Sequence, residues 1–240
     1  MKKIFIAAVL ILFAVSFIAF TKKQHRVLVF SKTMGYHHNS IAAGNIAIIK
    51  LGMLNGFSVD TTKDAAEFNS KNLKKYNAVI FLSTTGNVLN DEQQKAFESY
   101  IEHGGGFAGI HAATDTEYDW PWYNKLVGAY FNSHPKQQNA VLHVIDTTFI
   151  ATKNLPTEWK RWDEWYNFKS IQLEDLHVLL TIDEKSYIGG ENADFHPMSW
   201  YHDFDGGRAF YTALGHTDES FSEPFFLQHL LGGIKYAIGK

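Results

Sequence analysis

The chain has 240 residues, of which 45% are hydrophobic and 15% aromatic, so it is long enough and apolar enough to fold around a core. It contains no cysteine, which excludes disulfides, thiolate metal sites and a cysteine nucleophile. With 22 basic and 25 acidic residues its formal net charge is −3, and an acidic balance disfavours nucleic acid as a partner.

The N-terminal segment is typical of an export signal. A basic start, Met-Lys-Lys, precedes residues 4–20, which are apolar apart from Ser16. This length lies between that of a cleaved signal and that of an anchor. We therefore expect a signal peptide or N-terminal membrane anchor over residues 1–22 and one exported domain over residues 25–240. That domain would be periplasmic, or would face the periplasm and touch the membrane only through an uncleaved segment.

The first half of the chain alternates short apolar runs with helical patterns. The runs at residues 26–30, 57–61, 78–82 and 107–110 predict buried strands. Strands that alternate with helices in this way predict a parallel sheet covered on both faces. The fold class that we expect is therefore α/β, with a mainly parallel, doubly wound sheet.

Helix signals stand between these strands. Residues 40–54 have helical spacing and stop at an Asn-Gly pair, which is a C-cap signal. The face predicted to turn inward carries Ile41, Ile46, Ile49 and Met53. Asn90 caps a further helix, with Gln93 at the reciprocal capping position.

The second half is less regular. An aromatic helix is expected over residues 120–131, and a last amphipathic helix opens at Pro224. Expected strands cover residues 140–145, 177–182, 198–204 and 208–214, the last two joined by a turn at Asp205-Gly206-Gly207. No internal repeat or linker interrupts the pattern, which favours a single domain.

Histidines stand beside turn residues at the ends of several elements. The strand at 107–110 follows a glycine-rich turn and ends on His111, with Asp115 four residues further on. Open α/β sheets carry their chemistry at the carboxyl ends of strands, so His111 is a candidate general base or metal ligand. Asp115 would orient His111, contact substrate hydroxyls, or cap the following helix.

Six ordered motifs resemble the ThuA-like family, which is named for trehalose utilisation, over residues 26–240. They are Gly35-Tyr36-His37-His38-x-Ser40, Gly104-Gly105-Gly106-Phe107-x-Gly109-Ile110-His111-Ala112-Ala113-x-Asp115, Gly128-Ala129-x-Phe131-x-x-His134-Pro135, Asp163-Glu164-x-Tyr166, His196-Pro197-x-x-Trp200, and Gly207-Arg208-x-Phe210-Tyr211-x-x-Leu214-Gly215-His216. The resemblance implies a flavodoxin-like three-layer sandwich related to class I glutamine amidotransferases. It also implies a role in sugar catabolism, beside enzymes that act on disaccharides and their keto derivatives.

One departure from the wider superfamily bears on the chemistry. Class I amidotransferases place a cysteine at the sharp turn after a strand, where this chain has His111. The chain is therefore not expected to be a glutamine amidotransferase.

The expected site combines these histidines with one acidic residue. Glu164 lies among aromatic residues, and apolar surroundings raise a carboxyl pKa toward values useful in acid-base catalysis. The candidate catalytic residues are His111, Glu164 and Asp115, and the candidate substrate-binding residues are His38, His134, Tyr166, His196, Trp200 and His216. The candidate metal ligands are His111, His134, His196 and His216.

Three functions remain open from the sequence. In the first, His111 or Glu164 moves a proton on a disaccharide or keto-glycoside, or activates water, and no cofactor is required. In the second, histidines with Glu164 or Asp115 hold a divalent metal that serves a sugar hydrolase or isomerase. In the third, the protein binds sugar without catalysis through its aromatic side chains. All three take a small carbohydrate as partner.

Overall fold

A computed structural model of the chain describes residues 24–240. The predicted signal peptide or anchor over residues 1–22 lies outside the described residues. Among residues 24–240, no helix combines the length and the hydropathy needed to cross a bilayer.

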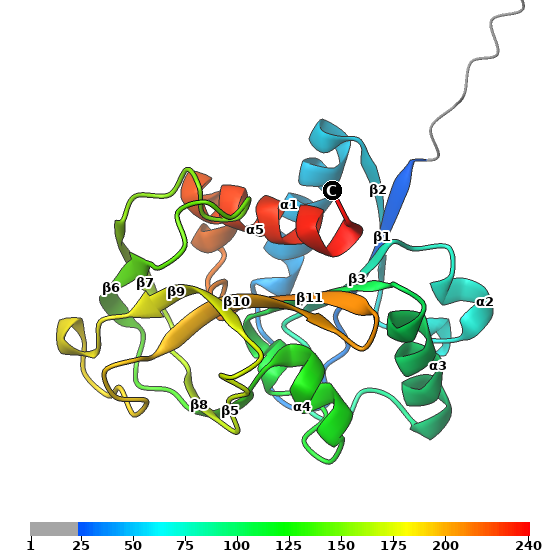
Figure 1. The fold of residues 1–240 in the computed structure, drawn as a ribbon, viewed down its shortest axis with the longest axis horizontal. Helices are drawn as coiled ribbons and strands as arrows, with labels where there is room; N and C mark the ends of the chain where they lie inside the picture. The colour runs from blue at the N-terminus through cyan, green and yellow to red at the C-terminus, as the bar shows by residue number, and fades with distance from the viewer. Residues whose placement is uncertain (1–23) are drawn as a thin grey trace, which may run out of the picture.

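A nine-stranded sheet forms the centre of the described part of the chain, in the order β2-β1-β3-β4-β11-β10-β9-β6-β7 (Figure 1). Its strands are β1 (His25–Phe30), β2 (Phe57–Thr62), β3 (Ala78–Leu82), β4 (Gly106–Ile110), β6 (Gln138–Val144), β7 (Glu158–Asp163), β9 (His177–Ile182), β10 (Pro197–Phe204) and β11 (Gly207–Thr212). A second, two-stranded sheet pairs β5 (Tyr130–Ser133) with β8 (Asn167–Lys169).

The two halves of the large sheet differ in strand direction. Strands β2, β1, β3, β4 and β11 are parallel, in the order of a flavodoxin-like sheet. Beyond β11, each of the pairs β11-β10, β10-β9, β9-β6 and β6-β7 is antiparallel. The α/β, flavodoxin-like fold class is confirmed, and an antiparallel extension is added to the predicted parallel core.

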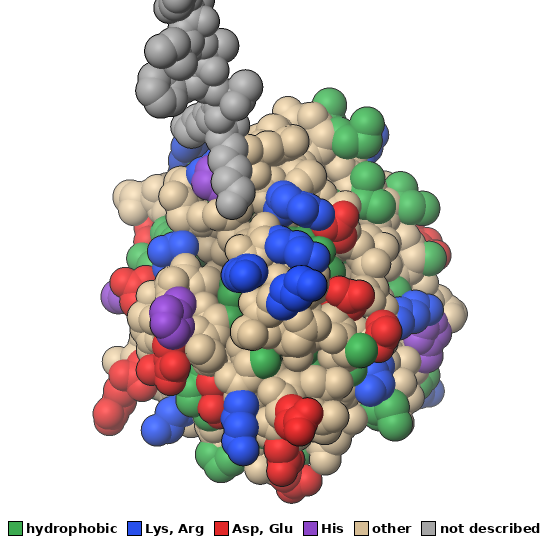
Figure 2. Space-filling model, turned by 90° about the vertical axis from the view of Figure 1, so that its right-hand side faces the viewer, with side chains coloured by type: hydrophobic (Ala, Val, Ile, Leu, Met, Phe, Trp, Pro, Cys, Tyr) green, Lys and Arg blue, Asp and Glu red, His purple; other side chains and the backbone are tan. Residues whose placement is uncertain are grey.

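Helices cover both faces of the sheet, which gives three layers. α1 (Ile41–Asn55) and α5 (Pro224–Ile238) lie on one face, and α2 (Ser70–Leu73), α3 (Asp91–Glu102) and α4 (Pro121–Val127) lie on the other (Figure 1). The expected capping box is present, because Asn90 and Gln93 each accept a backbone N–H of the other. Figure 2 views the end of the molecule where α2 and α3 lie, and Lys and Arg gather near its middle with Asp and Glu around them.

The prediction for the buried face of α1 was right for Ile41 but wrong for Ile46 and Met53. Ile46 and Met53 are 69% and 80% exposed, and the buried face instead carries Ile41, Gly44, Ala47, Ile48, Leu51 and Gly52. A Cβ at Gly52 would lie 2.7 Å from the carbonyl oxygen of Phe57. The helix lies so close to the sheet that its inner face needs small residues. The spacing of the largest side chains therefore did not identify the buried face.

The aromatic helix predicted over residues 120–131 is shorter than expected. α4 ends at Val127, where Gly128 has a left-handed φ of 93°. The indole of Trp200 donates to the carbonyl of Val127 and fills the space that a Cβ on Gly128 would need. The chain then turns into β5. Gly128 and Trp200, which belong to two different sequence motifs, therefore pack against each other.

Candidate active site

Four side chains meet at one edge of the sheet because four strands end there. His38 lies in the loop after β1, His111 directly follows β4, and His216 lies beyond β11. Glu164 directly follows β7, which runs in the same direction as β11 because two pairs of antiparallel steps separate them. Carboxyl ends of strands therefore bring together residues that are far apart in the sequence, as the open-sheet rule predicts.

Glu164 is at the centre of this group. Its Oε2 lies 3.0 Å from His216 Nδ1 and 3.4 Å from His111 Nε2, and those two nitrogens are 3.1 Å apart. Burial opposes ionisation of Glu164, but the hydrogen bonds with His111 and His216 outweigh it and hold its pKa below the usual value. The sequence-based expectation of a raised pKa for this carboxyl is therefore wrong.

The ring of His38 completes the group. It lies edge-on to His111 and His216, with ring centroids 4.8 Å and 5.1 Å away. Burial, followed by the two neighbouring imidazoles, lowers the pKa of His38 to about 2, so this ring is neutral. Its Nδ1 is buried and makes no hydrogen bond.

His111 is held in one orientation by the backbone. Its Nδ1 lies 2.7 Å from the carbonyl oxygen of Ala213, so Nδ1 donates to this carbonyl and Nε2 faces the cluster. The residue has a left-handed φ of 50°, which is strained for a residue other than glycine. The predicted partner, Asp115, makes no hydrogen bond to His111; its carboxylate accepts from Tyr118 Oη at 2.6 Å. The orienting role proposed for Asp115 is therefore corrected to the Ala213 carbonyl.

His134 and Tyr166 border the group. His134, after β5, is 44% exposed, and its Nδ1 lies 3.2 Å from Oε1 of Glu164. The ring of Tyr166 is buried and its centroid lies 4.3 Å from that of His111. His134 is thus the partner of Glu164 that solvent and a ligand can reach, while Tyr166 forms the wall behind His111.

Two predicted site residues are not part of the group. His196 is fully buried, with Nε2 2.8 Å from the Tyr166 carbonyl oxygen and Nδ1 2.9 Å from Glu184 Oε1. Trp200 is fully buried under Gly128. Because neither side chain is free to meet a substrate, the expectation that they bind one, and that His196 ligates a metal with the other histidines, is not supported. His196 instead holds the backbone of Tyr166.

Asp163 is a buried anchor that sequence reasoning did not select. Its carboxylate accepts the backbone N–H groups of Glu164, Gly215 and His216, and it lies 3.0 Å from Nη2 of Arg161. One side chain therefore fixes the backbone on both sides of the Glu164–His216 contact. Its position beside Glu164 in the resembling motif was the available signal.

The four central residues fit a divalent cation. One ligand atom from each of His38, His111, Glu164 and His216 can be chosen so that all lie within 4.8 Å of one another. Ligand atoms around a tetrahedral ion with ~2.1 Å bonds lie ~3.4 Å apart, so the longest separations in this group must shorten when an ion binds. A ligating histidine usually donates its other N–H to a carbonyl, as His111 does, and the buried Nδ1 of His38 has no hydrogen-bond partner among residues 24–240.

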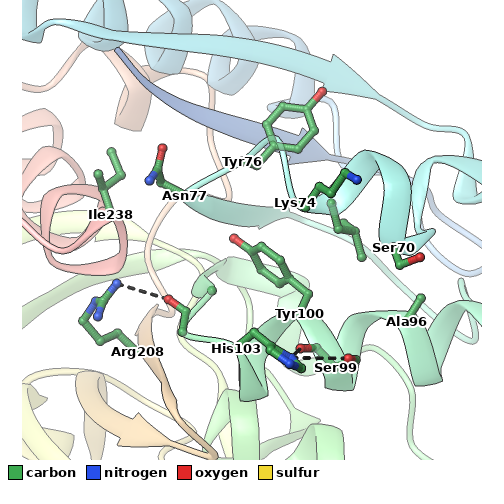
Figure 3. A pocket seen from close by; sticks show the side chains of 13 residues that line it. Ser70, Lys74, Tyr76, Asn77, Ala96, Ser99, Tyr100, His103, Arg208 and Ile238 are labelled. Carbon is green, nitrogen blue, oxygen red and sulfur yellow. Dashed lines mark hydrogen bonds between the residues drawn. The ribbon is translucent and has the colours of Figure 1, made fainter. Parts of the chain in front are cut away.

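A separate cavity of about 400 Å³ lies at the opposite edge of the sheet, at the amino ends of β3, β4 and β11. Figure 3 shows Tyr76, Tyr100, His103 and Arg208 around it. His103 Nδ1 lies 2.7 Å from the Ser99 carbonyl oxygen, and Arg208 donates to the carbonyls of Tyr236 and Gly104. The His103 and Arg208 side chains are thus hydrogen-bonded to the backbone of helix ends and turns. This cavity is separate from the histidine cluster.

Comparisons with known proteins agree with the fold. The family model ThuA, described as trehalose utilisation, matches residues 26–237. The structure is similar to a ThuA-like protein from Bacteroides uniformis ATCC 8492, with a TM-score of 0.77 and 26% identity over 90% of this chain and 92% of that one. A ThuA-like protein from Parabacteroides merdae ATCC 43184 has a TM-score of 0.75 and 21% identity over 91% of each chain.

A more distant likeness extends to part of a larger enzyme. A β-galactosidase from Bacillus circulans sp. alkalophilus matches with a TM-score of 0.59 and 12% identity over 90% of this chain but 31% of that one. Identity this low shows a common fold alone. A search of curated protein sequences found no significant match.

Proposed function

Because the chain belongs to the ThuA family, whose description is trehalose utilisation, we propose that it is a carbohydrate-active enzyme that uses a divalent metal on a disaccharide or its keto derivative. His38, His111, Glu164 and His216 hold the metal, and His134 exchanges the proton with the substrate. The observation that carries this proposal is the convergence of four ligand atoms within 4.8 Å at the carboxyl ends of the strands.

The ligand set suits the activation of a ketone. Three neutral imidazoles and one carboxylate leave a divalent ion with net positive charge, and such an ion polarises a carbonyl oxygen as a Lewis acid. His111 and Glu164, expected from the sequence to carry protons, serve as ligands in this arrangement.

His134 is the group placed to move a proton. It is 44% exposed, and its Nδ1 lies 2.9 Å from the Pro135 carbonyl oxygen and 3.2 Å from Glu164 Oε1, which together orient the ring. It takes the proton from the carbon next to the ketone, and the C–H electron pair moves toward the ketone oxygen. If His134 returns that proton to the former ketone carbon, and the hydroxyl proton on the first carbon passes to the former ketone oxygen, the ketone is isomerised. If the glycosidic oxygen instead leaves from the carbon on the other side of the deprotonated one and takes the proton from His134, the ketone reforms beside a new C=C bond and the second sugar is released, which is elimination.

Metal-free acid-base catalysis is the second candidate. The contacts of Glu164 with His111, His216 and His134 also form a proton-transfer network without an ion. Export of the protein, inferred from residues 1–22, remains part of the proposal and would place this chemistry outside the cytoplasmic membrane.

Metal binding and turnover test the proposal together. We expect the purified protein to bind one divalent ion, and turnover of the keto derivative of trehalose to be lost with a chelator and restored by zinc or manganese. Glu164→Gln should abolish both, whereas the exposed control Glu174→Gln should change neither. Turnover that survives chelation favours the metal-free network, and absence of turnover in the metal-loaded protein contradicts the enzymatic proposal.

A further inference from the structure

A second cavity adjoins the histidine cluster. Its volume is about 670 Å³, and it lies between β7, at the open edge of the sheet, and residues 217–223. The lining residues are Gln137, Lys160, Arg161, Trp162, Thr217, Glu219, Ser220 and Glu223. Small-molecule sites commonly have volumes of roughly 300–1,000 Å³, so this cavity is large enough for a sugar ring.

Backbone continuity joins this cavity to the cluster. Thr217 directly follows His216, and Trp162 precedes Glu164 by two residues, which is a span of ~7 Å along an extended chain. The two sites also share Asp163, which accepts the backbone N–H of His216 and lies 3.0 Å from Nη2 of Arg161 in the cavity wall. A ligand with two joined rings can therefore extend from one site into the other.

An indole in this wall is half exposed. Trp162 is 52% exposed because the side chains of β7 alternate, and those of Trp159 and Arg161 face the opposite, buried side of the strand. Aromatic faces stack against the apolar face of a sugar ring, and large aromatic groups are seldom left in water without a use. Trp162 is thus available as a stacking platform.

Polar groups line the rest of this cavity. Arg161 lies on the opposite face of β7 from Trp162, its side chain is 3% exposed, and its Nε and Nη1 have no hydrogen-bond partner among residues 24–240. Gln137, Thr217 and Glu219 add donors and acceptors of both kinds. The positive charge of Arg161 is balanced by its ion pairs with Asp163 and Glu223. The cavity therefore suits a neutral polyhydroxyl ligand better than an anion.

We propose that this cavity, formed by Trp162, Arg161 and residues 217–223, is a second sugar subsite, so that the substrate is a two-ring glycoside and not a monosaccharide. The inference rests on the proposed carbohydrate function of the cluster. One ring meets the histidines, and the other stacks on Trp162.

Binding of trehalose and glucose to the metal-free protein tests this subsite by calorimetry. We expect trehalose to bind at least ~10-fold more tightly than glucose, and Trp162→Ala to weaken trehalose binding by ~10-fold, which corresponds to the loss of one stacking contact. Trp162→Phe keeps a ring and should recover most of the affinity. Phe195→Ala removes another exposed aromatic side chain, outside this cavity, and should change nothing.

The outcomes separate this inference from the proposed function. If no divalent ion binds but trehalose affinity still depends on Trp162, the subsite stands and the metal proposal fails. If the ion binds at the cluster but Trp162→Ala leaves trehalose affinity unchanged, the subsite is wrong. Equal affinity for the two sugars, or no measurable trehalose binding, also overturns it.

Discussion

The two edges of the sheet use similar residues for different purposes. At the amino ends, His103 donates to a carbonyl in the last turn of α3, and Arg208 donates to the Gly104 carbonyl (Figure 3). Arg208 also donates to the Tyr236 carbonyl in the last turn of α5. These groups give a second hydrogen bond to helix-end carbonyls that already accept a backbone N–H. At the carboxyl ends, Glu164 and three imidazoles face one another, and His38 Nδ1 has no hydrogen-bond partner.

This difference distinguishes a structural histidine from a functional one. A cavity lined by basic and aromatic side chains occurs at the amino edge, but its His103, Arg208 and Asn77 side chains are hydrogen-bonded to the backbone. At the carboxyl edge, by contrast, buried ionisable side chains contact one another. Their burial costs desolvation free energy, and packing alone would not require it. We therefore expect a substitution at the carboxyl edge to have a larger effect on stability or turnover than a similar substitution at the amino edge.

The largest effect on stability is expected for Asp163→Asn. The change removes the carboxylate that pairs with buried Arg161 and leaves that guanidinium without its nearest counterion. We expect a loss of ~3–5 kcal/mol in the free energy of unfolding, as for other broken buried pairs. Asp203→Asn, at an exposed position near the amino edge, should cost less than ~1 kcal/mol. Urea denaturation measures both, and similar losses would contradict the anchoring role of Asp163.

A paired His→Ala comparison tests the functional difference between the edges directly. His111→Ala should lower turnover of the keto sugar by ~100-fold or more, because a ligand or proton carrier is lost. His103→Ala should leave turnover within a factor of ~2, since His103 bonds only within its own helix turn. Steady-state kinetics with circular dichroism as a folding check provides the measurement. Equal turnover in both variants would remove His111 from the mechanism.

The cluster should also make stability depend on pH in the metal-stripped protein. The folded pKa of His38 is lowered to about 2, well below its unfolded value, so below ~6.5 the unfolded chain binds the extra proton. Stability should therefore fall as pH drops from ~6.5, by roughly 2 kcal/mol at pH ~5. Thermal melts across this range should be flatter for His38→Asn. If stability depends on pH equally steeply in this variant, a group other than His38 takes up the proton.

The smallest effect is expected at the amino edge. The Tyr100 hydroxyl lies 3.4 Å from the Gly106 carbonyl oxygen, which is a long hydrogen bond. Tyr100→Phe keeps the ring that packs against Gly105 and should change the free energy of unfolding by less than ~1 kcal/mol, with turnover unaffected. A marked loss of turnover would show that the amino-edge cavity takes part in function.

Several features follow from the sequence because their causes are local. The apolar runs of β3 and β4 are long enough to be buried strands, and Asn90 with Gln93 forms the capping box that its spacing predicts. The Asp205-Gly206 turn joins β10 and β11 as expected. The alternation of strand and helix was sufficient for the fold class, and His111 at a strand end was sufficient to indicate the active edge.

Other features depend on neighbours that are distant in the sequence. β7 was not predicted, because its alternation of charged and aromatic residues becomes a strand signal only beside β6. The inner face of α1 was decided by close approach to the sheet, and the burial of Trp200 was decided by the space above Gly128.

The site itself divides in the same way. Strand-end position was enough to select His111 and His216, whereas His38 was preferred because of the resembling motif and Glu164 because of its aromatic neighbours in the sequence. Only the tertiary structure decided that His196 bonds to Glu184 and the Tyr166 backbone, and that Ala213 orients His111 in place of Asp115. Hydrogen-bond partners depend on which loops meet in space, and that is set by the order and direction of strands across the whole sheet.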